Sequence, residues 1–316
     1  MFIFLSSIFL SKIFPMPIEY RVKFPRISED EMRAIDYRVM SHVFATQNEL
    51  GRLCDESYAS QLKTALVRHP KSLRHRMSRR SQTRSYLLGC VSVYQLSLAT
   101  RLIEAGFRVR IEEPITLTFR DFTTTLFVDL VVDDKVPYEL KAVSRLSDEH
   151  ENQLLNYMLM MDANRGKVVN FRSDGVQSRF VNAPLPTSER RRFEIHDSRW
   201  SGDAAFRRLV TELVADWGTS LEQSHYIKAL VACLGGEDRV IRQIPMASNG
   251  QSLGNQRFLL AAESIPFRLT TFPDGAPQDF EKQLHKLLMP SPFELFYWVN
   301  IGRHCLEFRT VRQEDG

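Results

Sequence analysis

The sequence predicts an α/β protein in which a mixed sheet flanked by helices occurs twice, as an active-type domain and as a degenerate domain. Two observations predict this. Within residues 30–182, a helical stripe of apolar residues is followed by apolar runs of strand length and an amphipathic helix. Similar apolar patterns return in residues 204–316 at a nearly constant offset. This alternation favours a sheet with helices on its faces.

The elements of the first copy follow from the spacing of its apolar residues. Residues 30–50 carry an apolar stripe of helical period, and Gly106 ends a second helix over 93–105. A third helix, over 148–161, begins after cap-like residues at Ser147. Strands are expected at 107–119, 125–132, 136–143, 167–171 and 177–182.

The segment 127–143 carries the residues with the clearest chemistry. Residues 133–135 supply a turn between two apolar runs, so the segment is expected to form two strands. Residues i and i+2 share one face of a strand, which points Glu139 and Lys141 the same way. Asp129, on the preceding strand, could converge with them. Carboxylate oxygens suit Mg²⁺, and a neighbouring lysine can orient water or neutralise charge on a phosphate.

Asp129 followed by Glu139-Leu140-Lys141 resembles the central motif of the PD-(D/E)XK nuclease superfamily. The resemblance implies a restriction-endonuclease-like fold, a mixed sheet flanked by helices. The alternative is a surface strand on which Glu139 and Lys141 form an ion pair without catalytic meaning.

Gln153 and Tyr157 extend the resemblance, because residues four apart share one face of the helix 148–161. They resemble the Q-x-x-x-Y helix of the RecB-type branch of this superfamily. The strand YELKAV, the helix HENQLLNY and the strand VVNF most resemble a bacterial group named after a GxxExxY motif.

The resemblance also implies a function and roles for particular residues. The expected activity is hydrolysis of phosphodiester bonds in DNA or RNA with Mg²⁺ or Mn²⁺. The resemblance assigns Asp129, Glu139 and Glu56 to the metal, with the Leu140 carbonyl, and it assigns catalytic roles to Lys141, Gln153 and Tyr157.

The second copy keeps the apolar pattern and loses this chemistry. Residues 256–272 align with 127–143 without a gap, at an offset of 129. In this alignment Asp129, Glu139 and Lys141 are replaced by Phe258, Arg268 and Thr270. The second copy is therefore expected to pack against the first, to form a homodimer, or to grip substrate. Two rival hypotheses follow: a catalytically silent nucleic-acid-binding module, and an assembly protein.

The net charge of +4 hides an uneven distribution. Residues 58–92 hold eight basic side chains and no acidic one, so the remainder carries −4. This stretch interrupts the segment in which Glu56 and Tyr94 would form an ExxY motif, with Gly51 or a neighbour as its glycine. Three interpretations stay open for it: a disordered loop, a basic arm for nucleic acid, or a product of gene annotation.

The remaining boundaries follow from composition. Residues 1–15 are apolar, lack a basic residue before Lys12 and are too short to span a bilayer, so they are expected to be a non-native extension; the alternative is a membrane anchor. Two nuclease-like domains are expected at 16–183 and 204–316, joined by a linker over 184–203 whose arginine run 190–192 favours a solvated surface. The four cysteines lie far apart, which favours reduced thiols and a cytoplasmic protein. No contact with a membrane is expected.

Overall fold

The computed structural model describes residues 17–52, 54 and 93–313. The expected extension 1–15, the insertion 58–92 and Glu56 therefore lie outside the described residues. None of the described helices is long and apolar enough to cross a membrane.

The chain divides into two compact units. The N-terminal unit consists of residues 20–115 and 126–184, and the C-terminal unit contains the described parts of 1–19, 116–125 and 185–316. Residues 116–125, the far end of a β-hairpin, belong to the C-terminal unit, where Phe119 and Phe122 contact the ring of Trp217.

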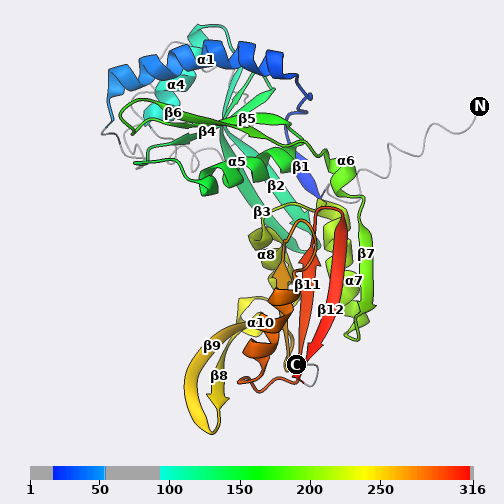
Figure 1. Cartoon of the computed structure of the whole chain (residues 1–316). Coiled ribbons are helices and arrows are strands. Elements are labelled where there is room, and N and C mark those ends of the chain that lie inside the picture. Colours follow the sequence, from blue (N-terminus) through cyan, green and yellow to red (C-terminus); the bar gives the residue numbers. More distant parts are fainter. Residues whose placement is uncertain (1–16, 53, 55–92, 314–316) are drawn as a thin grey trace, which may run out of the picture. The chain divides into compact units, whose positions relative to one another are not determined.

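The first sheet has six strands in the order β1-β2-β3-β4-β5-β6 (Figure 1). Strands β4 and β5 are parallel, whereas β3–β4 and β5–β6 are antiparallel. In chain order its elements are β1 (Ile18–Tyr20), α1 (Glu29–Leu50), α4 (Val93–Glu104), β2 (Val109–Phe119), β3 (Phe122–Val132), β4 (Val136–Lys141), α5 (Asp148–Met161), β5 (Arg165–Asn170) and β6 (Gln177–Asn182).

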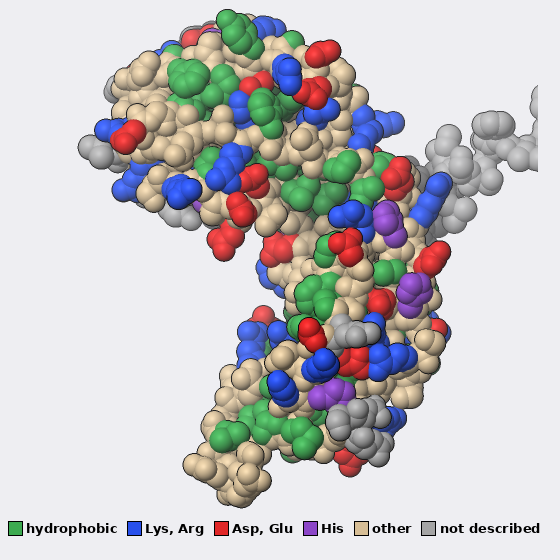
Figure 2. Space-filling model, viewed as in Figure 1, with side chains coloured by type: hydrophobic (Ala, Val, Ile, Leu, Met, Phe, Trp, Pro, Cys, Tyr) green, Lys and Arg blue, Asp and Glu red, His purple; other side chains and the backbone are tan. Residues whose placement is uncertain are grey.

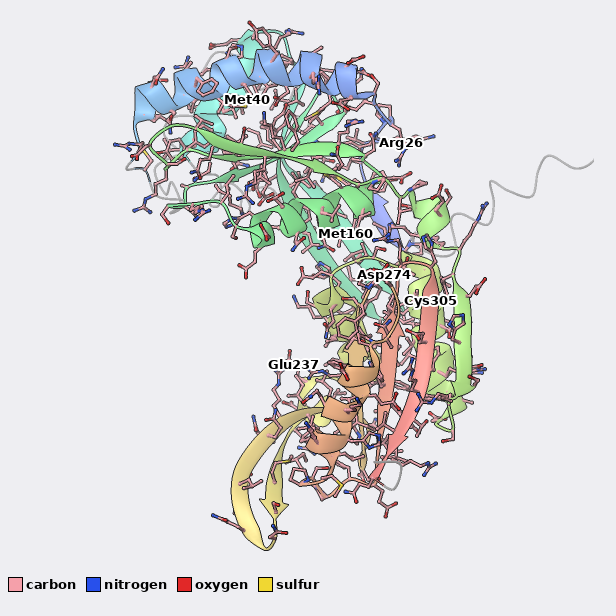
Figure 3. The ribbon with its side chains drawn as sticks, in the orientation of Figure 1. Arg26, Met40, Met160, Glu237, Asp274 and Cys305 are labelled. Carbon is pink, nitrogen blue, oxygen red and sulfur yellow. The ribbon has the colours of Figure 1, made fainter. Side chains whose placement is uncertain are left out.

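One face of helix α1 builds much of the core of the N-terminal unit. The helix begins at Ser28, whose Oγ accepts a hydrogen bond from the Glu31 backbone N–H at 3.1 Å. Val39 and Val43 of its apolar stripe are fully buried against α4 and the sheet, and Ile35 and Met40 pack at the margin of this core (Figure 3). The amphipathic period of residues 30–50 is thus used for packing.

The second sheet also has six strands, in the order β7-β12-β11-β10-β9-β8. Its elements are α6 (Thr187–Arg190), β7 (Glu194–Arg199), α7 (Ala204–Trp217), α8 (Gln223–Cys233), α9 (Glu237–Val240), β8 (Ile241–Ser248), β9 (Gln251–Ala262), β10 (Ile265–Thr270), α10 (Gln278–Leu288), β11 (Leu295–Ile301) and β12 (Cys305–Arg312).

Five strands follow the same order in both sheets: β2 to β6 in the first correspond to β8 to β12 in the second. The register agrees as well. Lys141 pairs with Asn170 across β4–β5, and Thr270 pairs with Asn300 across the parallel strands β10–β11. The predicted fold class, mixed sheets flanked by helices in two similar halves, is confirmed. The sequence did not predict the edge strands β1 and β7, which are the two strands that the halves do not share.

In each half, a buried tyrosine bonds to the glycine that ends a long helix, α1 in the first half and α7 in the second. Tyr94 donates its hydroxyl proton to the Gly51 carbonyl at 2.8 Å, and Tyr226 donates to the Gly218 carbonyl at 2.6 Å. Both glycines follow the last helical residue, with φ of 69° for Gly51 and 78° for Gly218, a region that favours glycine.

The expectation of a solvated arginine run over 190–192 is wrong for Arg190. This side chain is 1% exposed, and its Nη1 donates to the carbonyls of Trp217 and Thr219 at 3.1 and 2.8 Å. The Arg190 guanidinium therefore provides hydrogen-bond donors and positive charge to carbonyls at the end of α7, which carry a partial negative charge. Charge patterning alone cannot distinguish such a buried arginine from a solvated one.

Candidate active site

The hairpin of β3 and β4 brings the two predicted metal-binding carboxylates to one face of the first sheet. The antiparallel register pairs Leu130 with Tyr138, and its continuation by one residue sets Asp129 opposite Glu139. Asp129 Oδ2 accepts a hydrogen bond from the Leu140 backbone N–H at 2.7 Å. This bond fixes the Asp129 carboxylate beside β4.

Lys141 is the last residue of β4, and its side chain reaches helix α5. Its Nζ donates to Glu139 Oε1 at 2.7 Å and to Gln153 Oε1 at 3.0 Å. Gln153 Nε2 in turn donates to the Tyr157 hydroxyl at 3.0 Å, one helical turn further along α5. Glu139, Lys141, Gln153 and Tyr157 therefore form one continuous chain of hydrogen bonds, which we call the Lys141 chain.

Two further residues belong to this neighbourhood and were not predicted. Gln95 Nε2, on α4, donates to Glu112 Oε1 at 2.8 Å and to the backbone carbonyl of Asp129 at 2.6 Å. Glu112 lies within β2 with φ of 51°, a left-handed conformation that is strained for a residue other than glycine. Neither residue has a spacing signal in the sequence, because Glu112 reaches Gln95 from an irregular point of its strand.

Burial and mutual repulsion weaken the acidity of these groups. Burial, followed by the nearby Glu139 carboxylate, raises the pKa of Asp129 well above its ordinary value. Burial also raises the pKa of Glu112, against the opposing effect of the Gln95 hydrogen bond. The pKa of Tyr157 is raised to about 12, mainly by burial. Its phenol is therefore protonated at neutral pH.

The comparison with protein families bears on this same region. Residues 86–181 match the model of the PD-(D/E)XK nuclease superfamily. The matched segment runs from before α4 into β6 and includes Asp129, Glu139 and the rest of the Lys141 chain. A comparison with curated proteins found no match.

The donor atoms of the site fit the divalent metal that PD-(D/E)XK nucleases typically use. Asp129 and Glu139 offer carboxylate oxygens, and Leu140, the residue after Glu139, offers a backbone carbonyl; hard cations prefer such ligands. Charge on Asp129 is disfavoured by burial and by Glu139, and a bound cation would relieve both effects. Within the described part of the chain, no three His, Cys, Asp or Glu side chains gather as a complete metal site.

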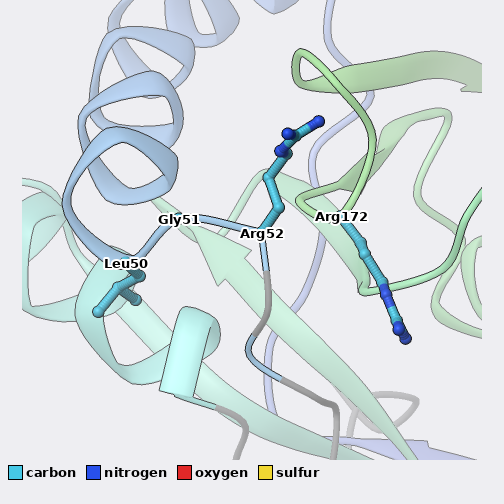
Figure 4. A pocket seen from close by; sticks show the side chains of 4 residues that line it. All are labelled: Leu50, Gly51, Arg52 and Arg172. Atoms are coloured by element: carbon cyan, nitrogen blue, oxygen red, sulfur yellow. The ribbon is translucent and has the colours of Figure 1, made fainter.

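Two arginines line a cavity in the same unit as the nuclease-like site. The cavity has a volume of about 440 Å³ and is bordered by Leu50, Gly51, Arg52 and Arg172 (Figure 4). Arg52 forms an ion pair with Asp174. Arg172 follows the carboxyl end of β5, which neighbours the carboxyl end of β4 where Lys141 lies. This end of the sheet thus carries a second basic side chain, Arg172, in addition to Lys141.

Proposed function

We propose that the N-terminal unit is a metal-dependent nuclease that hydrolyses phosphodiester bonds in DNA or RNA with Mg²⁺ or Mn²⁺. The observation that carries the proposal is the Lys141 chain beside the Asp129 carboxylate, within the segment that matches the PD-(D/E)XK nuclease superfamily. Each of these side chains supplies a group that phosphodiester hydrolysis needs.

In the proposed reaction, Asp129 and Glu139 would hold the cation. Bound Mg²⁺ or Mn²⁺ lowers the pKa of water and offsets negative charge that accumulates on the phosphate. The ammonium of Lys141 orients the attacking water or stabilises the charge on the phosphate oxygens. Gln153 positions Lys141 through its Oε1, and Tyr157 positions Gln153. The protonated phenol of Tyr157 remains available as a hydrogen-bond donor.

The proposed metal site also includes a third carboxylate, from a residue outside the part of the chain that the structure describes. We infer that Glu56 completes the metal shell through a water, in the manner of the helical glutamate of the GxxExxY group. Tyr94, which bonds to the Gly51 carbonyl, supports this view because it brings the start of α4 next to the end of α1. The two ends between which Glu56 lies in sequence are therefore close together.

We also infer that the two units are copies of one ancestral unit, and that the second copy has lost its catalytic residues. The shared order of five strands, the equal register at Asn170 and Asn300, and the two glycine–tyrosine pairs support this. We retain two nuclease-like domains near 16–183 and 204–316 and keep a homodimer as one use of the second copy. The segment 184–203, expected as a linker, instead supplies α6 and β7, which belong to the C-terminal unit.

The proposed nuclease activity has a direct test. Purified full-length protein is incubated with labelled single- and double-stranded DNA and RNA, in Mg²⁺, Mn²⁺ or EDTA. We expect cleavage of at least one substrate with metal, none with EDTA, and none with D129N. The matched control D279N makes the same charge change on an exposed residue of α10 and should cleave like the wild type. Binding without cleavage of any substrate would favour a silent nucleic-acid-binding module instead.

A further inference from the structure

The C-terminal unit carries a two-stranded ribbon formed by β8 and β9, residues 241–262 (Figure 1). Its tip is a tight turn at Asn249 and Gly250, whose φ values of 49° and 77° are both positive. A turn of this kind matches the twist of antiparallel strands and favours Asn-Gly. Ser248 and Gln251 pair on either side of it. The sequence therefore encodes a well-defined hairpin tip.

The base of the β8–β9 ribbon is anchored and its outer part is exposed. Met246 is buried in an apolar cluster with Phe258, and the Ala247 backbone N–H donates to the Pro290 carbonyl at 2.8 Å. From 247 to 257 every residue is exposed. The anchored base supports an exposed tip, an arrangement suited to reaching a partner.

The exposed part of the β8–β9 ribbon is acid-free and largely polar, although it also exposes the apolar side chain of Leu253. Residues 241–262 contain two arginines and no aspartate or glutamate. Gln243 pairs with Arg257, and their side chains share the ribbon face that bears Asn255. No described carboxylate forms an ion pair with Arg242 or Arg257. On the visible side in Figure 2 the tip is tan, without the red of acidic side chains.

The outer edge of the β8–β9 ribbon is poorly suited to extending a sheet in another protein chain. Pro245 lacks a backbone N–H, and the register shifts between Met246 and Ala247. Prolines and bulges on an edge strand oppose strand-to-strand association. The features that remain for recognition are amide, hydroxyl and guanidinium side chains, together with the exposed apolar side chain of Leu253.

We propose that the β8–β9 ribbon is a recognition arm that enters the groove of double-stranded DNA. The major groove of B-form DNA, about 12 Å wide, admits a two-stranded ribbon, and Asn, Gln and Arg are the side chains that read base edges there. Arg242 and Arg257 contact phosphates, which needs an acid-free surface. The deep, narrow major groove of double-stranded RNA excludes such an arm. The inference deepens the proposed function, since it rests on nucleic acid as the substrate.

The test measures binding separately from cleavage. Full-length protein is titrated into fluorescent 20-base-pair DNA in EDTA, with single-stranded DNA and double-stranded RNA of equal length as further arms, at several salt concentrations. The variants are R242A/R257A, Q243A/N255A and the control R268Q, which removes an exposed arginine of β10 from the same unit. Circular dichroism checks that each variant is folded.

We expect R242A/R257A to weaken binding to double-stranded DNA at least about tenfold. Its slope of log affinity against log salt should become shallower by about 1.8, because each lost phosphate contact removes about 0.9. Q243A/N255A should weaken binding about 5- to 30-fold with an unchanged slope. R268Q should bind like the wild type.

Wild-type affinity in both ribbon variants would overturn the recognition arm, as would equal losses on all three nucleic acids. Neither result would bear on cleavage. If instead the ribbon variants lose DNA affinity while the wild type cleaves no substrate with any metal, the recognition arm stands and the nuclease proposal falls.

Discussion

The two units place different side chains at equivalent points of the same strand order. Where β3 of the N-terminal unit has Asp129, β9 has Phe258, which is 3% exposed and packs its ring 5.3 Å from that of Phe293. Where β4 has Glu139, which is 1% exposed, β10 has an exposed Arg268. At this point the C-terminal unit has apolar packing where the N-terminal unit has a buried carboxylate, and apolar packing is the arrangement that folding stability favours.

The two units also differ in the direction in which folding shifts the pKa of an acidic side chain. Burial raises the pKa of Asp129, and Glu139 raises it further. Burial also acts to raise the pKa of Glu281 on α10, but hydrogen bonds from Arg199 and Arg309 outweigh it, and the pKa is lowered. One unit keeps a carboxylate in an unfavourable setting, and the other pairs its carboxylate fully. Unfavourable groups of this kind concentrate at functional sites.

The largest expected difference between the units concerns cleavage. The substitutions E139Q and R268Q place glutamine at corresponding positions of β4 and β10. E139Q should lower the rate of phosphodiester cleavage at least about 100-fold, because it removes a metal-binding charge. R268Q should leave the rate within about twofold. Cleavage rates under single-turnover conditions measure both, and equal losses would remove the distinction between the units.

The second prediction concerns the paired carboxylate. E281Q should lower the free energy of unfolding by about 1–3 kcal/mol at pH 7, because charged hydrogen bonds to two arginines are lost. Since the pKa of Glu281 is lowered by folding, its contribution is present above the unfolded pKa and disappears as pH falls through the folded value. Urea unfolding at pH 7 and at acidic pH measures this. A loss that does not shrink in acid would contradict the ion-pair account.

The third prediction has the opposite sign. D129N should raise the free energy of unfolding by about 1–2 kcal/mol at pH 7 in EDTA, because a charge disfavoured by burial is removed. Folding raises the pKa of Asp129, so the wild type loses stability as pH rises from the unfolded pKa toward the folded value. The gain from D129N should therefore vanish near pH 3. Urea titrations across this range decide it, and a destabilised D129N at pH 7 would count against the account.

The smallest expected effect is a loss of stability that should be similar in the two units. Y94F and Y226F each remove a hydroxyl that bonds to a glycine carbonyl at the end of a helix. Each should cost about 1–2 kcal/mol, because the glycine carbonyl loses its partner and, in Y226F, the Leu221 backbone N–H also loses the hydroxyl that accepts from it at 3.2 Å. Urea unfolding of both variants tests the correspondence. A loss in one unit with none in the other would weaken the inference that these are copies of one unit.

Much of this comparison could be predicted from apolar spacing. The helix expected over 148–161 is α5 from Asp148 to Met161, and the strand expected over 177–182 is β6. The turn at 133–135 also agrees, with Asp133 and Asp134 in positive-φ conformations. These elements have strong periodic patterns bounded by turn or cap residues, so their local sequence carries the information.

Other features depend on contacts that spacing does not report. Strand β1 is only three residues long, and β7 is a polar strand held at an edge by β12. The sequence around Arg190 is typical of a surface arginine, and only the fold brings the carbonyls at the end of α7 to its side chain. Glu112 joins the site through a strained backbone and through Gln95 of another helix. Each is a tertiary effect that overrides the local pattern.

The central claim is that the N-terminal unit, and not its counterpart, holds a divalent cation through Asp129 and Glu139. Isothermal titration of full-length wild type, D129N and D279N with Mn²⁺ tests it most directly, without a substrate. We predict measurable Mn²⁺ binding by the wild type and D279N, and an affinity lower by at least about tenfold in D129N. Equal Mn²⁺ affinity in all three proteins, or none in the wild type, would contradict the claim.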